Sequence, residues 1–122
     1  PRPPAPPAWL TRALPPPPPP FPAAAERERV GRLLRAHAAE LRAMGIVHLA
    51  LFGSLARAAA GPGSDVDLLV EIAPGRRLPL WAMGEARVRL GEILGREVDL
   101  VIASDLAPAL RARIAPDLVP IL

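Results

Sequence analysis

Two aspartates, Asp65 and Asp67, stand one residue apart in the otherwise apolar segment DVDLLV. In an extended strand, residues two apart lie on the same face, with Cα atoms about 6.6–6.8 Å apart. Both carboxylates are therefore expected to point the same way, while Val66 and Leu68 fill the opposite face. A third aspartate, Asp99, stands in the similar segment EVDLV. If these two strands are neighbours in a sheet, the three carboxylates converge.

Three converging carboxylates repel one another unless a cation lies among them. Two unit charges about 5 Å apart repel by about 3 kcal/mol at an effective dielectric constant of 20. Oxygen ligands with no His or Cys nearby favour Mg²⁺ or Mn²⁺ over Zn²⁺, and Mg²⁺ usually keeps positions open for waters and substrate phosphates. We therefore predict a metal site at Asp65, Asp67 and Asp99, with Mg²⁺ as the cofactor and Mn²⁺ as the alternative.

Ten residues separate a Gly-Ser pair, Gly53 and Ser54, from the first aspartate. Glycine at a strand end lets a ligand approach the backbone closely, and the start of the next helix presents unpaired N–H groups to an anion. Arg57 follows one turn later and Ser64 precedes Asp65, so all four are candidates for nucleotide binding. Structural alternatives remain, with Ser54 as a helix N-cap, Arg57 as a solvent-facing residue and Asp65 as a turn residue.

Hydrophobic periodicity and end signals predict alternating helices and strands that position these residues. Helices are expected over 23–44, 54–60, 79–94 and 105–115, and strands over 46–52, 65–72 and 97–103. The order α-β-α-β-α-β-α indicates an α/β fold with helices covering a small sheet. The pattern leaves open whether neighbouring strands run parallel.

The helix predicted over 79–94 has two apolar sides. The stripe expected to face the core consists of Leu80, Met83, Ala86, Leu90 and Leu94. Trp81 and Val88 fall on a different side, where we predict a second buried edge, with a contact patch as the alternative. The two histidines, His37 and His48, have no partner at ligand spacing and are interpreted as ordinary helix and strand residues.

The N-terminal 22 residues differ in composition from the rest of the chain. They hold most of the 18 prolines, including an unbroken run at 15–20. Such a segment favours extended polyproline II and cannot bury a core, so we predict a disordered tail or linker over 1–22. Docking to a proline-recognising partner is the alternative. Residues 23–122 remain as one domain of about 100 residues, enough for one modest core.

The sequence pI of about 11.2 does not indicate a nucleic-acid-binding protein. The 15 basic residues are all Arg, and no Lys, Tyr or Cys buffers near pH 9–10. Without Arg2 and Arg12 of the tail, 13 arginines face 12 acidic residues, a net charge of +1. No stretch approaches the roughly 18–20 apolar residues of a membrane span, so we expect no membrane association. The absence of Cys leaves the compartment undecided, and a cytoplasmic location is the default expectation.

The motif GSLARAAAGPGSDVD resembles the GSx10DxD signature of the polymerase-beta-like nucleotidyltransferases. The small size and the segments EVDLV and LAPALRARI are similar to the minimal nucleotidyltransferases (MNT), antitoxins paired with HEPN-domain ribonucleases. The resemblance covers about residues 28–122 and implies the nucleotidyltransferase fold, a small mixed sheet flanked by helices. It also implies that Asp65 and Asp67 ligate two Mg²⁺ ions. Asp99 would hold one of them and help to deprotonate the acceptor, while Gly53 and Ser54 would bind the β- and γ-phosphates.

The resemblance implies transfer of AMP from ATP to a hydroxyl group, with release of pyrophosphate. In the MNT antitoxins the acceptor is a tyrosine of the HEPN toxin, whose RNase activity is thereby silenced. This chain has no Tyr, which favours an acceptor in trans and a hetero-oligomer with the toxin. Two departures from the family are Ala58, where Gly is usual, and Pro116, where a helix tends to continue.

Three other functions are compatible with the sequence. The first is a non-catalytic antitoxin of the same fold that neutralises its partner by contact alone. The second is a subunit of a small-molecule nucleotidyltransferase, whose acceptor would need a second domain that about 100 residues cannot supply. The third, an arginine-rich nucleic-acid binder, is disfavoured because the arginines are scattered among acidic residues.

Overall fold

The computed structural model describes residues 2–12 and 20–122. Within the predicted tail, a one-turn helix not expected from the sequence, α1 (Ala8–Thr11), leaves Trp9 and Leu10 exposed. Residues 15–19 of the proline run lie outside the described residues, so their predicted polyproline II conformation stays a prediction.

The predicted helix over 23–44 is interrupted near its middle. It forms α2 (Ala23–Ala36) and α3 (Ala38–Ala43), separated by His37 with φ −102° and ψ 17°. The His37 ring Nδ1–H donates to Leu33 O at 2.8 Å, and its backbone N–H is shared between Leu33 O and Leu34 O at 3.2 Å each. Such local bonds compete with the regular helical pattern, which explains why the prediction of one continuous helix is wrong here.

Four strands form one mixed sheet in the order β3-β2-β1-β4. The strands are β1 (Ile46–Phe52), β2 (Val66–Ile72), β3 (Val98–Ile102) and β4 (Val119–Pro120). β1 pairs antiparallel with β2 and β4, whereas β2 pairs parallel with β3. The mixed sheet flanked by helices is confirmed. β4 was not predicted, because a two-residue edge strand ending in Pro carries no periodic signal.

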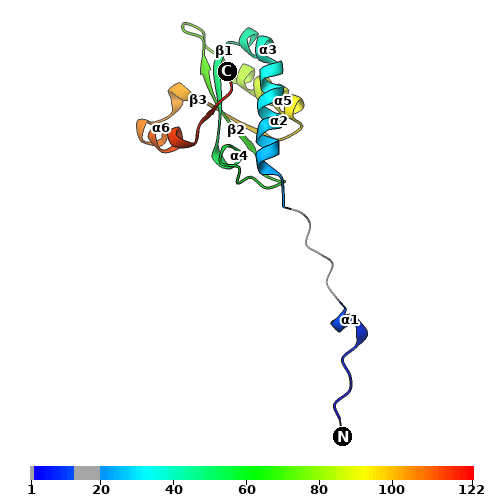
Figure 1. Ribbon diagram of the computed structural model, residues 1–122. Helices are drawn as coiled ribbons and strands as arrows, with labels where there is room; N and C mark the ends of the chain where they lie inside the picture. Colours follow the sequence, from blue (N-terminus) through cyan, green and yellow to red (C-terminus); the bar gives the residue numbers. More distant parts are fainter. Residues whose placement is uncertain (1, 13–19) are drawn as a thin grey trace.

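Helices cover the two faces of the sheet unequally. Figure 1 shows α2, α3 and α5 (Leu80–Leu94) on one side of the sheet and α6 (Pro108–Ile114) on the other. α2, α3 and α5 cover the core. Its largest fully buried side chains include Leu34, Leu49, Leu51, Leu68, Leu90 and Leu94. Alternate residues of β2 are buried, so its remaining side chains, Asp67 among them, face away from this core.

Several helices are shorter than predicted. α4 (Gly53–Ala56) is a single turn, and α6 is flanked by the 3₁₀ turns η1 (Ala103–Asp105) and η2 (Ala115–Asp117). Pro116 lies in η2, directly after the end of α6, as a helix-terminating residue should. In the described part of the chain, no helix has the length and apolar character needed to cross a membrane.

The outer side of α5 is exposed. Trp81 and Val88 are 68% and 62% exposed, so the prediction of a second buried edge is wrong. Leu80, predicted to face the core, is 89% exposed because it is the first residue of the helix and lies beyond the packed turns. Ala86, Leu90 and Leu94 are buried as predicted.

Candidate active site

Two of the predicted aspartates lie directly beside each other. In the parallel pair of β2 and β3, Asp67 is in register with Asp99, and Val66 is in register with Val98. Because Val66 and Val98 are buried in the core, Asp67 and Asp99 share the opposite face. Asp65 lies just before β2, two residues from Asp67, and is exposed. The sheet therefore brings the three predicted carboxylates to one place.

Gly53 lies against the Asp67 carboxylate. Phe52, the last residue of β1, pairs with Asp67, so Gly53 follows at the same end of the sheet. Gly53 has φ +72°, and a Cβ added there would overlap Asp67 Oδ2 and lie 3.0 Å from its Cγ. Glycine is therefore required at this position twice over, by its backbone conformation and by the approach of the carboxylate.

The carboxylates make this end of the sheet electronegative. Burial raises the pKa of Asp67, and the charges of Asp99 and Asp65 raise it further, while the Arg57 guanidinium lowers it. Ionised Asp67 is thus opposed both by lost hydration and by like charges. A bound cation would relieve both penalties.

The donor chemistry fits a hard divalent cation. The three side chains offer only carboxylate oxygens, which suit Mg²⁺ or Mn²⁺. In residues 2–12 and 20–122, however, no three His, Asp or Glu side chains are already arranged as a complete set of metal ligands. Asp65 and Asp99 are close enough for their charges to raise the pKa of Asp67, and both residues are exposed.

The predicted nucleotide-binding residues have different surroundings. Ser54 is the second residue of α4, whose N-cap is Phe52 without a side-chain bond, so the alternative of a Ser54 N-cap is wrong. Arg57 lies at the end of α4, with Nη1 3.8 Å from Asp117 Oδ2. The Ser64 hydroxyl accepts the Gly61 N–H at 2.9 Å and so stabilises its own loop. Nucleotide contacts of these residues stay predictions.

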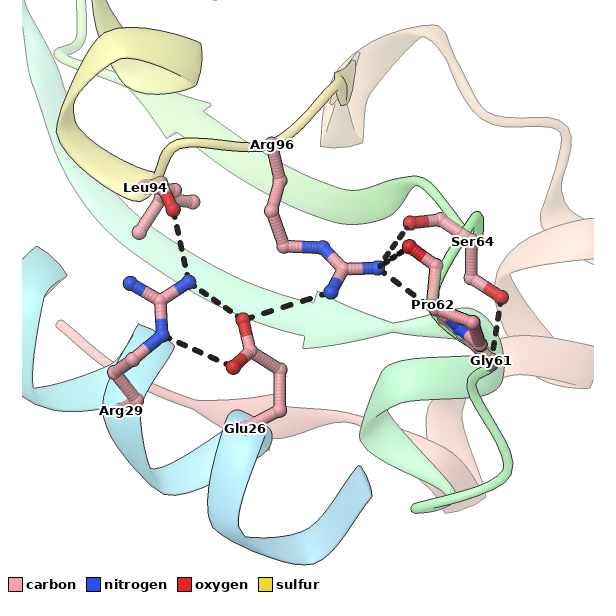
Figure 2. Close-up of polar contacts among 7 residues, drawn as sticks. All are labelled: Glu26, Arg29, Gly61, Pro62, Ser64, Leu94 and Arg96. Atoms are coloured by element: carbon pink, nitrogen blue, oxygen red, sulfur yellow. Dashed lines mark hydrogen bonds and ion pairs between the residues drawn. The ribbon is translucent and has the colours of Figure 1, made fainter. Parts of the chain in front are cut away.

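A network around Arg96 holds the loop that leads into Asp65. Figure 2 shows the Arg96 guanidinium directed at the carbonyl groups of Gly61, Pro62 and Ser64, with Ser64 O at 2.6 Å. On its other side, Arg96 Nη1 lies 3.6 Å from Glu26 Oε1 of α2. Because Arg96 lies two residues before β3, it joins the segment that leads into the strand of Asp99 to the loop before Asp65.

Arg29 completes this network on α2. It donates to the Glu26 carboxylate, with Nε 3.0 Å from Oε2, and to Leu94 O at 2.8 Å (Figure 2). The side chains of Glu26 and Arg96 are only 14% and 12% exposed. Sequence analysis did not detect the network, because Arg96 and the loop at 61–64 are far from Glu26 and Arg29 in the chain.

A pocket of about 370 Å³ opens beside Gly53. It is lined by Phe52, Gly53, Arg57, Leu110, Arg113, Ile114 and Asp117. α6 and η2 form one wall, so the C-terminal segment contributes to the same region as β1 and α4. Sequence analysis did not single out Arg113 or Asp117, since only the tertiary structure brings residue 117 near residue 57.

Comparison with known proteins supports the nucleotidyltransferase resemblance. The nucleotidyltransferase domain family matches residues 34–119. A candidate protein adenylyltransferase of Methanocaldococcus jannaschii is 35% identical over 78 residues, which cover 64% of this chain and 82% of that protein. The protein adenylyltransferase MntA of Thermococcus cleftensis is 38% identical over 81 residues, which cover 65% of this chain and 79% of that protein.

Solved structures share the fold. A structure described as a candidate minimal nucleotidyltransferase superposes with a TM-score of 0.63 at 32% identity, covering 82% of this chain and 96% of that chain. The complex of a tri-AMPylated Shewanella oneidensis HEPN toxin with its MNT antitoxin superposes with a TM-score of 0.52 at 20% identity, covering 82% of this chain and 71% of that chain. At that lower identity the likeness is one of fold.

Proposed function

Because the family match spans most of its length, the chain belongs to the nucleotidyltransferase domain family, and we propose that it is a protein adenylyltransferase. In this proposal it transfers AMP from ATP to a tyrosine hydroxyl of a partner HEPN toxin and acts as its antitoxin in a hetero-oligomer. Two relatives are named protein adenylyltransferases, and one structural neighbour is the antitoxin of an AMPylated HEPN toxin. The absence of Tyr from this chain is consistent with an acceptor in trans.

The observation that carries the proposal is the register of Asp67 and Asp99 beside Gly53. In the proposed reaction, the acceptor oxygen attacks the α-phosphorus of ATP. The bond from that phosphorus to the β-phosphate oxygen breaks, and pyrophosphate leaves. The hydroxyl proton passes to a carboxylate, for which we propose Asp99, exposed at the edge of the sheet.

Asp65, Asp67 and Asp99 are the residues that would hold Mg²⁺, with Mn²⁺ as the alternative. When bound, Mg²⁺ supplies positive charge that neutralises the phosphates and stabilises developing negative charge. Asp67 is turned toward Gly53, and Gly53 and Ser54 are proposed to contact the β- and γ-phosphates, with Arg57 and Ser64 as further nucleotide-binding candidates. In this proposal the chain contributes mainly by positioning ATP and the acceptor hydroxyl relative to each other.

The test is transfer of label to the product of the neighbouring gene or to another purified HEPN protein. The chain is incubated with that protein, Mg²⁺ and ATP labelled at the α- or the γ-phosphate. We expect label on the partner only from α-labelled ATP, and loss of label when metal is chelated. Mg²⁺ or Mn²⁺ should restore it. Label from γ-labelled ATP instead would indicate phosphoryl transfer and contradict the proposal.

The Asp67→Asn variant distinguishes a loss of catalysis from a loss of folding stability. Transfer should fall by about 100-fold or more, a loss of the size seen when one group that stabilises transition-state charge is removed. Because burial and like charges raise the pKa of Asp67, its ionised form opposes folding at neutral pH, so the melting temperature should stay the same or rise. Glu71→Gln is the control, since Glu71 is an exposed acid on the same face of β2. If Asp67→Asn still silences the toxin without transferring AMP, the result would favour the non-catalytic antitoxin that neutralises its partner by contact alone.

A further inference from the structure

The pocket beside Gly53 carries more positive than negative charge. Arg57 and Arg113 line it together with one acid, Asp117. Arg57 and Asp117 are 3.8 Å apart with half-exposed side chains, a geometry that stabilises a fold only slightly. Within the described chain, Arg113 has no ion pair or side-chain hydrogen bond, whereas nearby Arg111 donates to Ala103 O at 2.6 Å. Two guanidinium groups with so little internal pairing can accept an anion.

Gly53 lies on the border between this pocket and the aspartates. It lines the pocket and also lies against the Asp67 carboxylate. A ligand that runs past Gly53 would therefore have one end at the aspartates and the other between the arginines. The volume of about 370 Å³ lies at the lower end of the range for small-molecule sites.

We propose that this pocket binds the β- and γ-phosphates of ATP, with Arg113 as a direct ligand together with Arg57, and that Asp117 positions Arg57. The inference rests on the proposed function and names residues of α6 and η2 as part of its nucleotide site. Guanidinium groups bind phosphate oxygens through paired, charge-assisted hydrogen bonds. A triphosphate bound in this way runs past Gly53, so its α-phosphate reaches Asp67 and Asp99. Pyrophosphate then leaves from the side of the pocket that holds Arg57 and Arg113.

The test is equilibrium titration of the full-length chain, in Mg²⁺, with ATP, AMP and inorganic pyrophosphate as separate probes. Arg113→Ala should weaken binding of ATP and pyrophosphate by about tenfold or more, the usual effect of losing a hydrogen bond to a charged group. Affinity for AMP, which lacks the β- and γ-phosphates, should not change. Arg111→Ala removes the same charge from the same helix and should leave all three affinities unchanged.

The outcomes separate this inference from the proposed function. Equal effects of Arg113→Ala and Arg111→Ala, or equal weakening of ATP and AMP, would overturn the inference while leaving AMP transfer intact. Pyrophosphate binding that depends on Arg113, without any label transfer to a partner, would support the pocket and overturn the proposed function. No binding of ATP or pyrophosphate by the unmodified chain would overturn both.

The role of Asp117 is tested by steady-state kinetics. If Asp117 positions Arg57, Asp117→Ala should raise the KM for ATP by several-fold with little change in kcat, and Asp117→Glu should restore it. A structural role alone would lower the melting temperature without this split between KM and kcat. Equal kinetics for Asp117→Ala and the unmodified chain would contradict the positioning role.

Discussion

Ala58 carries backbone strain next to the candidate site. Among the described residues other than glycine, it alone has a positive φ, of 54°. A residue with a Cβ in this left-handed conformation costs about 1–2 kcal/mol relative to glycine. The turn after α4 requires the conformation, since the Ala58 N–H donates to Leu55 O at 3.0 Å. The glycine that the resemblance leads us to expect at this position would adopt this conformation without the strain.

Ala58→Gly should therefore keep or raise the melting temperature. The relief of strain offsets the greater entropy of the unfolded chain, about 0.4–1 kcal/mol, and the loss of one partly buried methyl group. Ala59→Gly, at the next residue without a positive φ, should lower the stability. We expect the two variants to differ by about 1 kcal/mol, or about 4–8 °C in thermal unfolding. Equal losses would show that Ala58 is unstrained.

At the scale of secondary structure, Glu26 joins three parts of the chain: α2, the segment before β3 and the loop before Asp65. The hydrogen bond from Arg29 lowers the pKa of Glu26, and the charges of Arg29 and Arg96 act in the same direction, although burial opposes them. Arg96 in turn holds the loop before Asp65 (Figure 2). Glu26 thus connects α2 to the start of β3 and to the loop that positions the first aspartate.

Glu26→Gln should lower the free energy of unfolding at neutral pH by about 1–3 kcal/mol, because Arg29 and Arg96 lose a charged partner. A carboxyl whose pKa is lowered by folding stabilises the fold above its unfolded pKa, about 4.3 for Glu. This contribution disappears as the pH falls through the lowered pKa of the folded state. Urea unfolding of both proteins from pH 7 to pH 3 should show the difference shrinking.

Glu28→Gln is the matched control for this series. Glu28 lies on the same helix, is exposed, and makes no ion pair in the described structure. Its replacement should change the stability by less than about 0.5 kcal/mol at any pH in the range. A Glu26→Gln effect that did not depend on pH would argue against the charged network.

At the scale of the whole molecule, the described residues from Phe21 onward include one core cluster, and Phe21 lies next to the predicted end of the N-terminal tail. Phe21 packs against the core cluster, and Arg96 lies over its ring at 5.4 Å from the centroid. Its carbonyl also accepts the Ala23 N–H at 2.8 Å. The domain boundary predicted between 22 and 23 therefore leaves out a residue that contacts the domain.

Truncation tests whether the domain begins at Ala23, as predicted, or already includes Phe21. Deletion of residues 1–19 should leave the melting temperature unchanged, because Phe21 is kept. Deletion of residues 1–22 should lower the stability by about 1–2 kcal/mol, since the cation–π contact and the ring burial are lost. Thermal unfolding followed by circular dichroism checks both, with Phe21→Ala in the full chain as confirmation. Equal melting temperatures for the two deletions would contradict the role of Phe21.

Short-range patterns in the sequence were enough to predict the principal elements and to select three aspartates for the candidate site. The two-residue period of a strand predicts that Asp65 and Asp67 share one face, although β2 begins only at Val66. Apolar periodicity predicts α2, α5 and the three longer strands. The break at His37 was missed because the local hydrogen bonds of His37 leave no trace in the apolar periodicity, which predicts one helix.

Contacts between distant segments were decided only by the tertiary structure. The parallel register of β2 and β3 places Asp99 beside Asp67, and the return of the C-terminal segment places Asp117 and Arg113 beside Arg57 and Gly53. The exposure of Trp81 likewise depends on which side of α5 the sheet occupies. Local periodicity determines which way a side chain points along its own element, whereas its neighbours are determined by how the whole chain packs around the core.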